Sequence, residues 1–334
     1  MIKKELLILR HGKSDWNVEC DDFHRPLVER GKRGAELLGV WLQQQHLFPD
    51  FILSSPAVRA IETARKCAKA MGLSDRHIYQ EPRIYEANAA TLKAILNECP
   101  HQAQRVMIVG HNPGLEHLLA DLVDHSLPET EDGKILPTAT VAHLTLSQHW
   151  SQTHTSCAQL HHLTRASLLP QAFPFVTLTG TEQRERPAYY YAQSGVIPYC
   201  MINGELKLLL ISAGSKQKWG FPKGVIEPGF SPQASAAKEA WEEAGLKGVV
   251  MDQALGCYSR EKWHGQCTIE VFPMAVTEMV DSHEWEESHR LRQWFSPKQA
   301  MEELNNPALS KMIKHLLAEL EKKECAVEKL DLNS

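Results

Sequence analysis

Two arginines and two histidines in the first half of the chain have the chemistry needed to bind and attack a phosphate group. They are Arg10, His11, Arg59 and His111. Guanidinium groups match phosphate oxygens with paired hydrogen bonds. One imidazole could attack phosphorus as a nucleophile, and the other could donate a hydrogen bond to oxygens that gain charge. This set indicates phosphoryl chemistry that needs no metal ion.

Three glutamates in the second half are spaced to lie on one face of a helix. Glu239, Glu242 and Glu243 stand at positions i, i+3 and i+4, which are neighbours on a helix surface. Three carboxylates repel one another unless a cation offsets their charge, and Mg²⁺ (or Mn²⁺) would do so while bridging to substrate phosphates. Such a metal activates water and neutralises a leaving diphosphate. The alternative is an acidic, solvated helix face.

The first set must be positioned by a sheet, because each member follows an apolar run bounded by a glycine or a serine. Strands alternating with helices predict a parallel α/β sheet, which binds ligands at the carboxyl ends of its strands. Pro56 is expected to be the first residue of the second helix. The predicted strands are 5–9, 51–55 and 106–110, and the predicted helices cover 30–46, a segment after Pro56, and 115–123.

The glutamate-bearing segment has its own helix signals. Ser231 is a good N-cap, Pro232 a good first helical residue and Gly245 a good stop. Before it, apolar runs at 195–202 and 206–212 flank an Asn-Gly pair, which predicts a β-hairpin. The second half therefore also mixes strands and helices.

The length of 334 residues suits two domains. We find no internal repeat, so the halves are expected to be different folds. The polar segment 176–192 has no apolar period and is interpreted as a linker. The predicted organisation is a domain at 1–175, the linker, and a domain at 193–325.

Three strings in the first half occur in an order that resembles the histidine phosphatase superfamily, with SixA-type phosphohistidine phosphatases as the nearest type. They are LILRHGKSDW, SSPAVRAIETA and VGHNPGLEHLLADL, and they are accompanied by Arg25-Pro26-Leu27 and LPTATVAHL. The resemblance covers roughly residues 1–175. It implies that His11 is transiently phosphorylated and that Arg10, Arg59 and His111 hold the phosphoryl group.

Many members of that superfamily add a carboxylic acid that protonates the leaving group. Glu86 is the best candidate by position, and the alternative is a solvated residue at the start of a helix. If the substrate is phosphohistidine, the imidazole leaves more easily than an alkoxide, so a missing acid matters less. The later histidines fit no metal-site spacing and are interpreted as surface residues; they are His143, His149, His154, His161 and His162.

The second half resembles the Nudix hydrolases, whose box reads G-x5-E-x7-R-E-U-x-E-E-x-G-U with U apolar. The matching residues are Gly224, Glu239, Ala240, Glu242, Glu243, Gly245 and Leu246. The resemblance covers roughly 193–320 and implies an α/β/α sandwich. It also implies that Glu239, Glu242 and Glu243 bind metal and that the Gly224 carbonyl joins them.

Two positions depart from the box. Its first glutamate is Phe230 here and its arginine is Lys238. In the family these two residues pair and brace the loop against the helix, so the double change reads as one compensated substitution, with Glu227 as an alternative partner for Lys238. We favour a Nudix domain that retains catalysis. The alternative is a Nudix domain that binds its ligand without hydrolysing it.

The strings KWGFPKG and EWEESHRLRQWFSPKQAMEEL resemble hydrolases of diadenosine polyphosphates and diphosphoinositol polyphosphates. The cations that could surround a polyphosphate are Lys216, Lys218, Lys223, Arg260 and Lys262. The alternative for each is that it is an ordinary charged residue of the protein surface. The family often draws a further metal ligand or base from a later loop. Glu284, Glu286 and Glu287 are the candidates, and the sequence does not choose among them.

Composition sets the expected surroundings. A net charge of −5 gives no reason to expect binding to nucleic acid or membranes. The eight cysteines form no C-x-x-C pair, which is typical of reduced thiols in cytosol. The run LLIL near the N-terminus is too short for the core of a signal peptide, and no apolar stretch is long enough to span a membrane. A cytoplasmic location is expected.

These observations favour a bifunctional phosphohydrolase that acts on a nucleotide or an inositol polyphosphate. A second interpretation is a protein phosphohistidine phosphatase whose Nudix half is a nucleotide-binding regulatory module, with a phosphorylated protein as partner. A third interpretation, with less support, makes both halves interaction modules.

Overall fold

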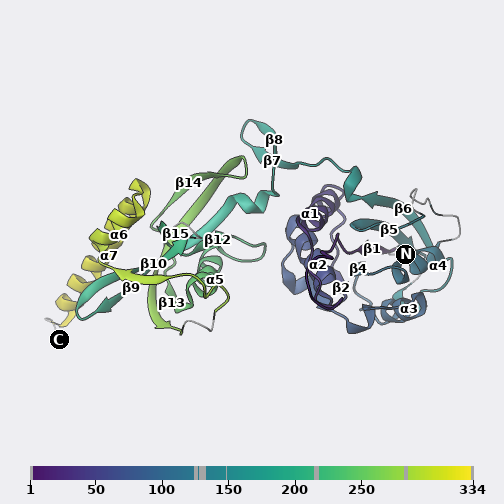
Figure 1. The fold of residues 1–334 in the computed structure, drawn as a ribbon, viewed down its shortest axis with the longest axis horizontal. Helices are drawn as coiled ribbons and strands as arrows, with labels where there is room; N and C mark the ends of the chain where they lie inside the picture. The colour runs from purple at the N-terminus through teal and green to yellow at the C-terminus, as the bar shows by residue number, and fades with distance from the viewer. Residues whose placement is uncertain are drawn as a thin grey trace. The chain divides into compact units, whose positions relative to one another are not determined.

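A computed structural model describes residues 3–123, 127, 133–147, 149–213, 218–281 and 285–331. The chain forms two compact units, Met1–Gln183 and Arg184–Ser334. Each unit combines one main sheet with helices (Figure 1). Lys216 and Glu284, both named above as candidates, lie outside the described residues.

The first unit is built on a six-stranded sheet in the order β3-β2-β4-β1-β5-β6. Its first four strands are parallel, which confirms the predicted α/β sheet. β5 and β6 continue it in antiparallel pairing. The strands are β1 (Lys4–Arg10), β2 (Phe51–Ser54), β3 (Ile78–Gln80), β4 (Arg105–Gly110), β5 (Thr140–Leu146) and β6 (Ala158–Arg165).

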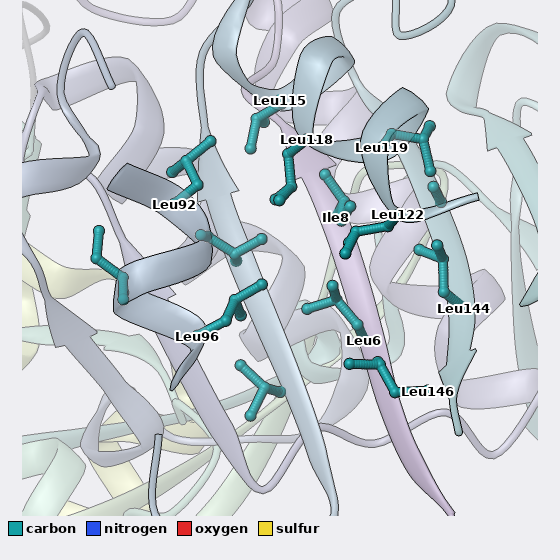
Figure 2. Packing of buried hydrophobic residues seen from close by; sticks show 14 of the residues in the cluster. Leu6, Ile8, Leu92, Leu96, Leu115, Leu118, Leu119, Leu122, Leu144 and Leu146 are labelled. Carbon is teal, nitrogen blue, oxygen red and sulfur yellow. The ribbon is translucent and has the colours of Figure 1, made fainter. Parts of the chain in front are cut away.

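Strand β1 is buried on both faces, as a central strand of an α/β sheet must be. Leu6 and Ile8 point to one face, where leucines of α3 (Ala89–Asn97) and α4 (Gly114–Leu122) pack against them (Figure 2). Leu7 and Leu9 point to the other face. There they meet α1 (Glu29–Gln44) and α2 (Val58–Met71). Continuous apolar strands are therefore explained by two covering layers.

The start of α2 corrects one detail of the sequence analysis. The helix begins at Val58 with Ala57 as its N-cap, so Pro56 is not the first helical residue. The Ala57 amide donates to the Ser55 hydroxyl oxygen at 3.3 Å. This contact holds a bend between the strand and the helix and delays the helix by two residues.

Two glycines bring the start of α1 against the backbone that follows β1. A Cβ atom on Gly12 would lie 2.5 Å from the Gly31 carbonyl oxygen, and one on Gly31 would lie 2.1 Å from the Lys13 carbonyl oxygen. Only residues without a side chain allow this approach. The loop that carries His11 is thus fixed by direct backbone packing.

A short hairpin, β7 (Phe173–Thr177) with β8 (Gly180–Arg184), and the 3-10 helix Ala188–Tyr191 occupy most of the segment that the sequence analysis treats as a linker. The boundaries at 1–175 and 193–325 stay a prediction from the sequence. The two compact units meet in sequence inside this segment.

The second unit is built on an eight-stranded mixed sheet. The predicted hairpin is present as β9 (Ala192–Ile202) and β10 (Glu205–Ala213). Asn203 and Gly204 form its turn with φ of 52° and 79°. The other strands are β11 (Lys218–Gly220), β12 (Lys223–Val225), β13 (Leu246–Val250), β14 (Gly256–Lys262), β15 (Gly265–Met279) and β16 (Arg292–Phe295).

Helices cover both faces of this sheet, as the α/β/α prediction requires. α5 (Pro232–Ala244) lies on one side, and α6 (Pro297–Leu304) and α7 (Pro307–Asp331) lie on the other (Figure 1). The caps of α5 match the prediction: the Ser231 hydroxyl accepts from the Ala234 amide at 3.1 Å, and Gly245 ends the helix with φ of 60°. No helix within the described ranges is long and apolar enough to cross a membrane.

Candidate active sites

The four residues singled out in the first half line one cavity of about 940 Å³. Arg10 ends β1 and His11 follows it, Arg59 lies in the first turn of α2, and His111 follows β4. The parallel strands end at the same edge of the sheet, so they deliver all four side chains to one place. The structure therefore brings the predicted set together.

His11 is 7% exposed, and its Nδ1 lies 2.7 Å from the Gly12 carbonyl oxygen. A carbonyl only accepts, so Nδ1 carries the proton and Nε2 keeps its lone pair. Burial, together with the electrostatic effect of His111, Arg59 and Arg10, lowers the pKa of His11 to about 3, and the hydrogen bond to Gly12 only partly opposes this shift. His11 is thus a neutral imidazole near pH 7.

The two imidazoles are close neighbours, with ring centroids 5.1 Å apart. His111 Nε2 lies 2.9 Å from the Ser55 hydroxyl oxygen, and its buried Nδ1 has no hydrogen-bond partner among the described residues. Burial lowers the pKa of His111 to about 4, and Arg59 adds to this. A second neutral imidazole therefore stands beside the first.

Arg59 is held by an acidic residue that the sequence analysis missed. Its Nη2 donates to Asp22 Oδ2 at 2.7 Å, and Arg25 donates to the other oxygen of the same carboxylate at 2.6 Å. The Tyr85 hydroxyl also donates to Asp22 at 3.0 Å. Burial opposes ionisation, but the hydrogen bonds of Tyr85 and Arg59 keep the pKa of Asp22 below its usual value.

In the sequence analysis, Arg25 appears only as part of the Arg25-Pro26-Leu27 string and is assigned no role in the site. It lies over the Trp16 ring at 3.5 Å and lines the same cavity. Asp22 and Tyr85 carried no signal, because their segments meet only in the folded chain. Arg10 is fixed separately, by donating to the Leu136 carbonyl at 2.7 Å.

Glu86 also lines this cavity, and it is exposed. Its φ is 56°, a left-handed conformation that non-glycine residues rarely adopt. It precedes α3, whose N-cap is Asn88. Residues held in such conformations cluster at functional sites, so the geometry is compatible with the role of acid expected for Glu86.

In the second unit, the three glutamates of α5 have different surroundings. Glu243 is buried and accepts from the Lys223 amide and from Arg290, each at 2.8 Å. Glu242 accepts from Lys238 at 2.7 Å. No group of three or more His, Cys, Asp or Glu side chains in the described part of the chain has the arrangement of a metal site.

Glu239 is the glutamate best placed to hold a cation. Neither carboxylate oxygen has a hydrogen bond or ion pair among the described residues, and a Cβ atom on Gly224 would lie 2.1 Å from Oε1. Burial raises the pKa of Glu239 to about 7, and the charge of Glu243 adds to this. A carboxylate that no cation of the described chain pairs with, packed against the bare backbone of Gly224, fits a hard dication.

The expected brace between Lys238 and Glu227 is long. Lys238 Nζ lies 3.9 Å from Glu227 Oε1 but donates to Glu242 at 2.7 Å. Burial opposes the charge on Lys238, but its hydrogen bond to Glu242 and the charges of Glu227, Glu242 and Glu239 together outweigh burial and raise the pKa of the ammonium. Phe230, at the other altered position, is 42% exposed. Lys238 therefore binds a candidate metal ligand more closely than it binds the loop.

Three of the predicted cations, Lys223, Arg260 and Lys262, lie close enough to influence one another, and Lys223 also interacts with Glu243 and Glu239. Burial lowers the pKa of Lys223, with Arg260 and Arg290 adding to the effect and Glu243 opposing it. Lys262 has a lowered pKa for the same reasons, first burial and then Arg260 and Lys223. Lys218 is exposed in β11, and no interaction joins it to this group in the described chain.

Of the two later-loop candidates that the structure describes, Glu287 contacts the helix that carries the glutamates. Its amide donates to the Glu242 carbonyl at 3.1 Å, its side chain binds Arg290, and its charge helps raise the pKa of Glu243. Glu286 is exposed. Arg290 itself was not predicted, because a single arginine in a charged loop gives no signal from sequence.

Comparisons with known proteins agree with this division. The model of the histidine phosphatase superfamily (branch 1) matches residues 6–103, and the NUDIX domain model matches 193–316. An uncharacterized protein of Mycobacterium tuberculosis is 32% identical over 157 residues, covering 46% of this chain and 96% of its own length.

A relative of the second half is the mouse diphosphoinositol polyphosphate phosphohydrolase 3-alpha. It is 34% identical over 100 residues, which are 29% of this chain and 58% of that protein. A solved structure of the protein histidine phosphatase SixA complexed with tungstate is 22% identical. It covers 49% of this chain and 97% of its own, with a TM-score of 0.40.

Proposed function

Because the chain belongs to the histidine phosphatase superfamily through its first half and to the Nudix hydrolases through its second, we propose that this two-domain hydrolase has two chemically distinct sites. The first removes a terminal phosphoryl group through a phosphohistidine and needs no metal. The second cleaves a diphosphate linkage and needs a divalent cation, Mg²⁺ or Mn²⁺.

The observation that carries the first activity is the tautomer of His11. Its Nδ1 donates to Gly12, so the Nε2 lone pair can form a bond to phosphorus while the bond from phosphorus to the leaving group breaks. Arg10 and Arg59 neutralise the phosphoryl oxygens. The Nδ1 of His111, buried without a partner among the described residues, can donate to one of them. Glu86 protonates a poor leaving group, and water then releases orthophosphate from His11.

Phosphoryl transfer to the enzyme tests this activity. The full-length protein is mixed with a ³²P-labelled phosphomonoester in EDTA, quenched in base and analysed for acid-labile label. We expect label on the wild type and none on His11→Ala, with His101→Ala as the control because that exposed histidine lies outside the cavity. Equal labelling of wild type and His11→Ala contradicts the proposal.

In the second site, Glu239, Glu243 and the Gly224 carbonyl would hold the cation, which when bound activates water and stabilises the leaving phosphate. Lys223 and Arg260 would bind the remaining phosphate oxygens. Glu287, through its position beside Glu242 and Arg290, is the candidate to accept the proton of the attacking water. The raised pKa of Glu239 means that cation binding must also displace a proton at neutral pH.

The substrate proposed for the second site is a dinucleoside polyphosphate or a diphosphoinositol polyphosphate. The mouse relative, by its name, acts on the latter, and the cations Lys223, Arg260 and Lys262 support a polyanion. The first site would then remove phosphate from the product. A phosphate-release screen over both substrate classes, with Mg²⁺ and with EDTA, tests whether the two sites act one after the other. If the protein releases orthophosphate from no Nudix product, the proposal is contradicted.

One observation favours a second candidate function. Two of the three glutamates are bound by cations of the chain itself, Glu242 by Lys238 and Glu243 by Arg290. Such a site suits a nucleotide-binding regulatory module attached to a protein phosphohistidine phosphatase. Turnover of dinucleoside polyphosphate with Mg²⁺, abolished in Glu243→Gln, excludes this alternative; binding without turnover in the wild type supports it.

A further inference from the structure

A second, smaller cavity borders the one around His11. The neighbouring pocket has a volume of about 350 Å³ and shares four lining residues with the first: Lys13, Arg30, Pro137 and Thr138. The combined space is far larger than one phosphoryl group requires. A substrate that occupies both parts must therefore extend past Lys13 and Arg30.

The two shared cations have no partners in the described chain. Lys13 and Arg30 are exposed, and their side chains form neither a hydrogen bond nor an ion pair there. The acidic neighbour Glu29 has Lys32 at 3.2 Å. This differs from the inner cavity, where the Asp22 carboxylate binds both Arg25 and Arg59. Positive charge at the junction is thus uncompensated.

A third cation, Arg33, also lines the outer pocket. Arg33 donates to the Gln171 carbonyl and lies over the Phe173 ring at 5.2 Å. These contacts orient the Arg33 guanidinium. The outer pocket is therefore lined by Arg33 as well as by Lys13 and Arg30.

The position of Lys13 sets the scale of the ligand. It is two residues from His11, so their Cα atoms lie at most ~7 Å apart. An anion bound by Lys13 would be adjacent to the phosphoryl group on His11. Arginine and lysine beside each other suit a second phosphate, since charge-assisted hydrogen bonds to phosphate are the strongest that these side chains make.

We propose that Lys13 and Arg30 form a second anion subsite and that the phosphatase substrate is a small molecule with at least two phosphate groups. The terminal phosphoryl group is transferred to His11 and then to water, which yields orthophosphate and a product that keeps its second phosphate. This rests on the proposed phosphatase activity of the first unit. A phosphohistidine in a protein carries one phosphate and would leave the subsite empty.

Binding of matched phosphonates tests the proposal without depending on turnover. Titration calorimetry in EDTA compares methylphosphonate with methylenediphosphonate on the full-length protein. Wild type should bind the diphosphonate ~10-fold or more tightly than the monophosphonate, as expected for added charge-assisted contacts. In the double variant Lys13→Met/Arg30→Met the two affinities should become equal, while that for methylphosphonate changes less than about twofold.

Two control proteins locate the effect. Arg76→Met removes an exposed arginine that lies outside both pockets, and Lys223→Met/Arg260→Met removes cations of the second unit; both should retain the wild-type preference. A preference absent from the wild type, or unchanged in Lys13→Met/Arg30→Met, overturns the subsite. Absence of label on His11 contradicts the phosphatase activity instead, so the two failures are distinguishable.

Discussion

Arg290 donates a hydrogen bond of 2.8 Å to the buried carboxylate of Glu243. The arginine thus occupies one side of a glutamate that the Nudix box assigns to metal binding. Its guanidinium also binds Glu287 and the Ser212 carbonyl. The geometry makes Arg290 a competitor of the cation for this carboxylate.

We expect Arg290→Met to tighten metal binding. Removing a competing positive charge near a partly buried carboxylate should lower the dissociation constant for Mn²⁺ by roughly tenfold. Electron paramagnetic resonance of free Mn²⁺ measures this directly. The exposed Lys298→Met is the control. Unchanged Mn²⁺ binding in Arg290→Met would contradict this competition, and weaker binding would show that the arginine supports the metal site.

The same substitution should destabilise the metal-free protein. Burial raises the pKa of Glu243, whereas the hydrogen bond from the Lys223 amide and the charge of Arg290 lower it. Loss of the arginine therefore leaves the buried carboxylate with less compensation for its charge. We expect a loss of about 1–3 kcal/mol in the free energy of unfolding, partly restored by Mg²⁺. Denaturant unfolding with and without Mg²⁺ measures it, and equal stability of the two proteins would contradict the prediction.

The histidines of the first site should remain neutral through the physiological range. Their folded pKa values of about 3 and 4 lie below the ordinary value of 6.5, so the unfolded chain binds more protons between these limits. The contribution of these two histidines to the free energy of unfolding therefore rises with pH up to about 6.5, and it is lost as the pH falls towards 4. Nitrogen-15 NMR titration should show no protonation of His11 above pH 5; a midpoint near 6.5 would contradict this.

Asp22 should compete with phosphate for the arginines of the inner cavity. We expect Asp22→Asn to bind methylphosphonate ~10-fold more tightly, because the anion that pairs with Arg25 and Arg59 is removed. Titration calorimetry measures the affinity. Asp21→Asn is a matched control, since that exposed neighbour pairs with His24 and is not a lining residue of the cavity. An affinity that falls in Asp22→Asn would mean that the carboxylate chiefly orients the arginines.

Glu86→Gln should affect hydrolysis differently for substrates with poor and with good leaving groups. With an alkyl phosphate, loss of the acid should lower kcat by about 10²-fold or more. With phosphoramidate, whose nitrogen leaves readily, the change should be small. Steady-state phosphate release in EDTA measures both. Equal losses on the two substrates would mean that Glu86 acts on the shape of the site rather than as an acid.

Much of the framework could be predicted because it depends on local pattern. The apolar runs before His11 and His111 predict buried strands, and Ser231 and Gly245 define α5 from cap chemistry alone. Since parallel strands end at a common edge, the convergence of Arg10, His11, Arg59 and His111 also followed.

The partners of these residues could not be predicted, because they come from distant segments. Asp22 meets Arg59 across 37 residues of sequence, and Arg290 meets Glu243 across 47. No periodicity reports such contacts. The preference of Lys238 for Glu242 over Glu227 is likewise decided by side-chain geometry.

We propose that one chain carries a metal-free phosphatase site and a metal-dependent Nudix site. The most direct test measures hydrolysis of a phosphomonoester and of a dinucleoside polyphosphate by wild type, His11→Ala and Glu239→Gln, each in Mg²⁺ and in EDTA. We predict that His11→Ala loses only the first activity, in both buffers, and that EDTA and Glu239→Gln abolish only the second. Loss of both activities in EDTA, or in either variant alone, would contradict the account.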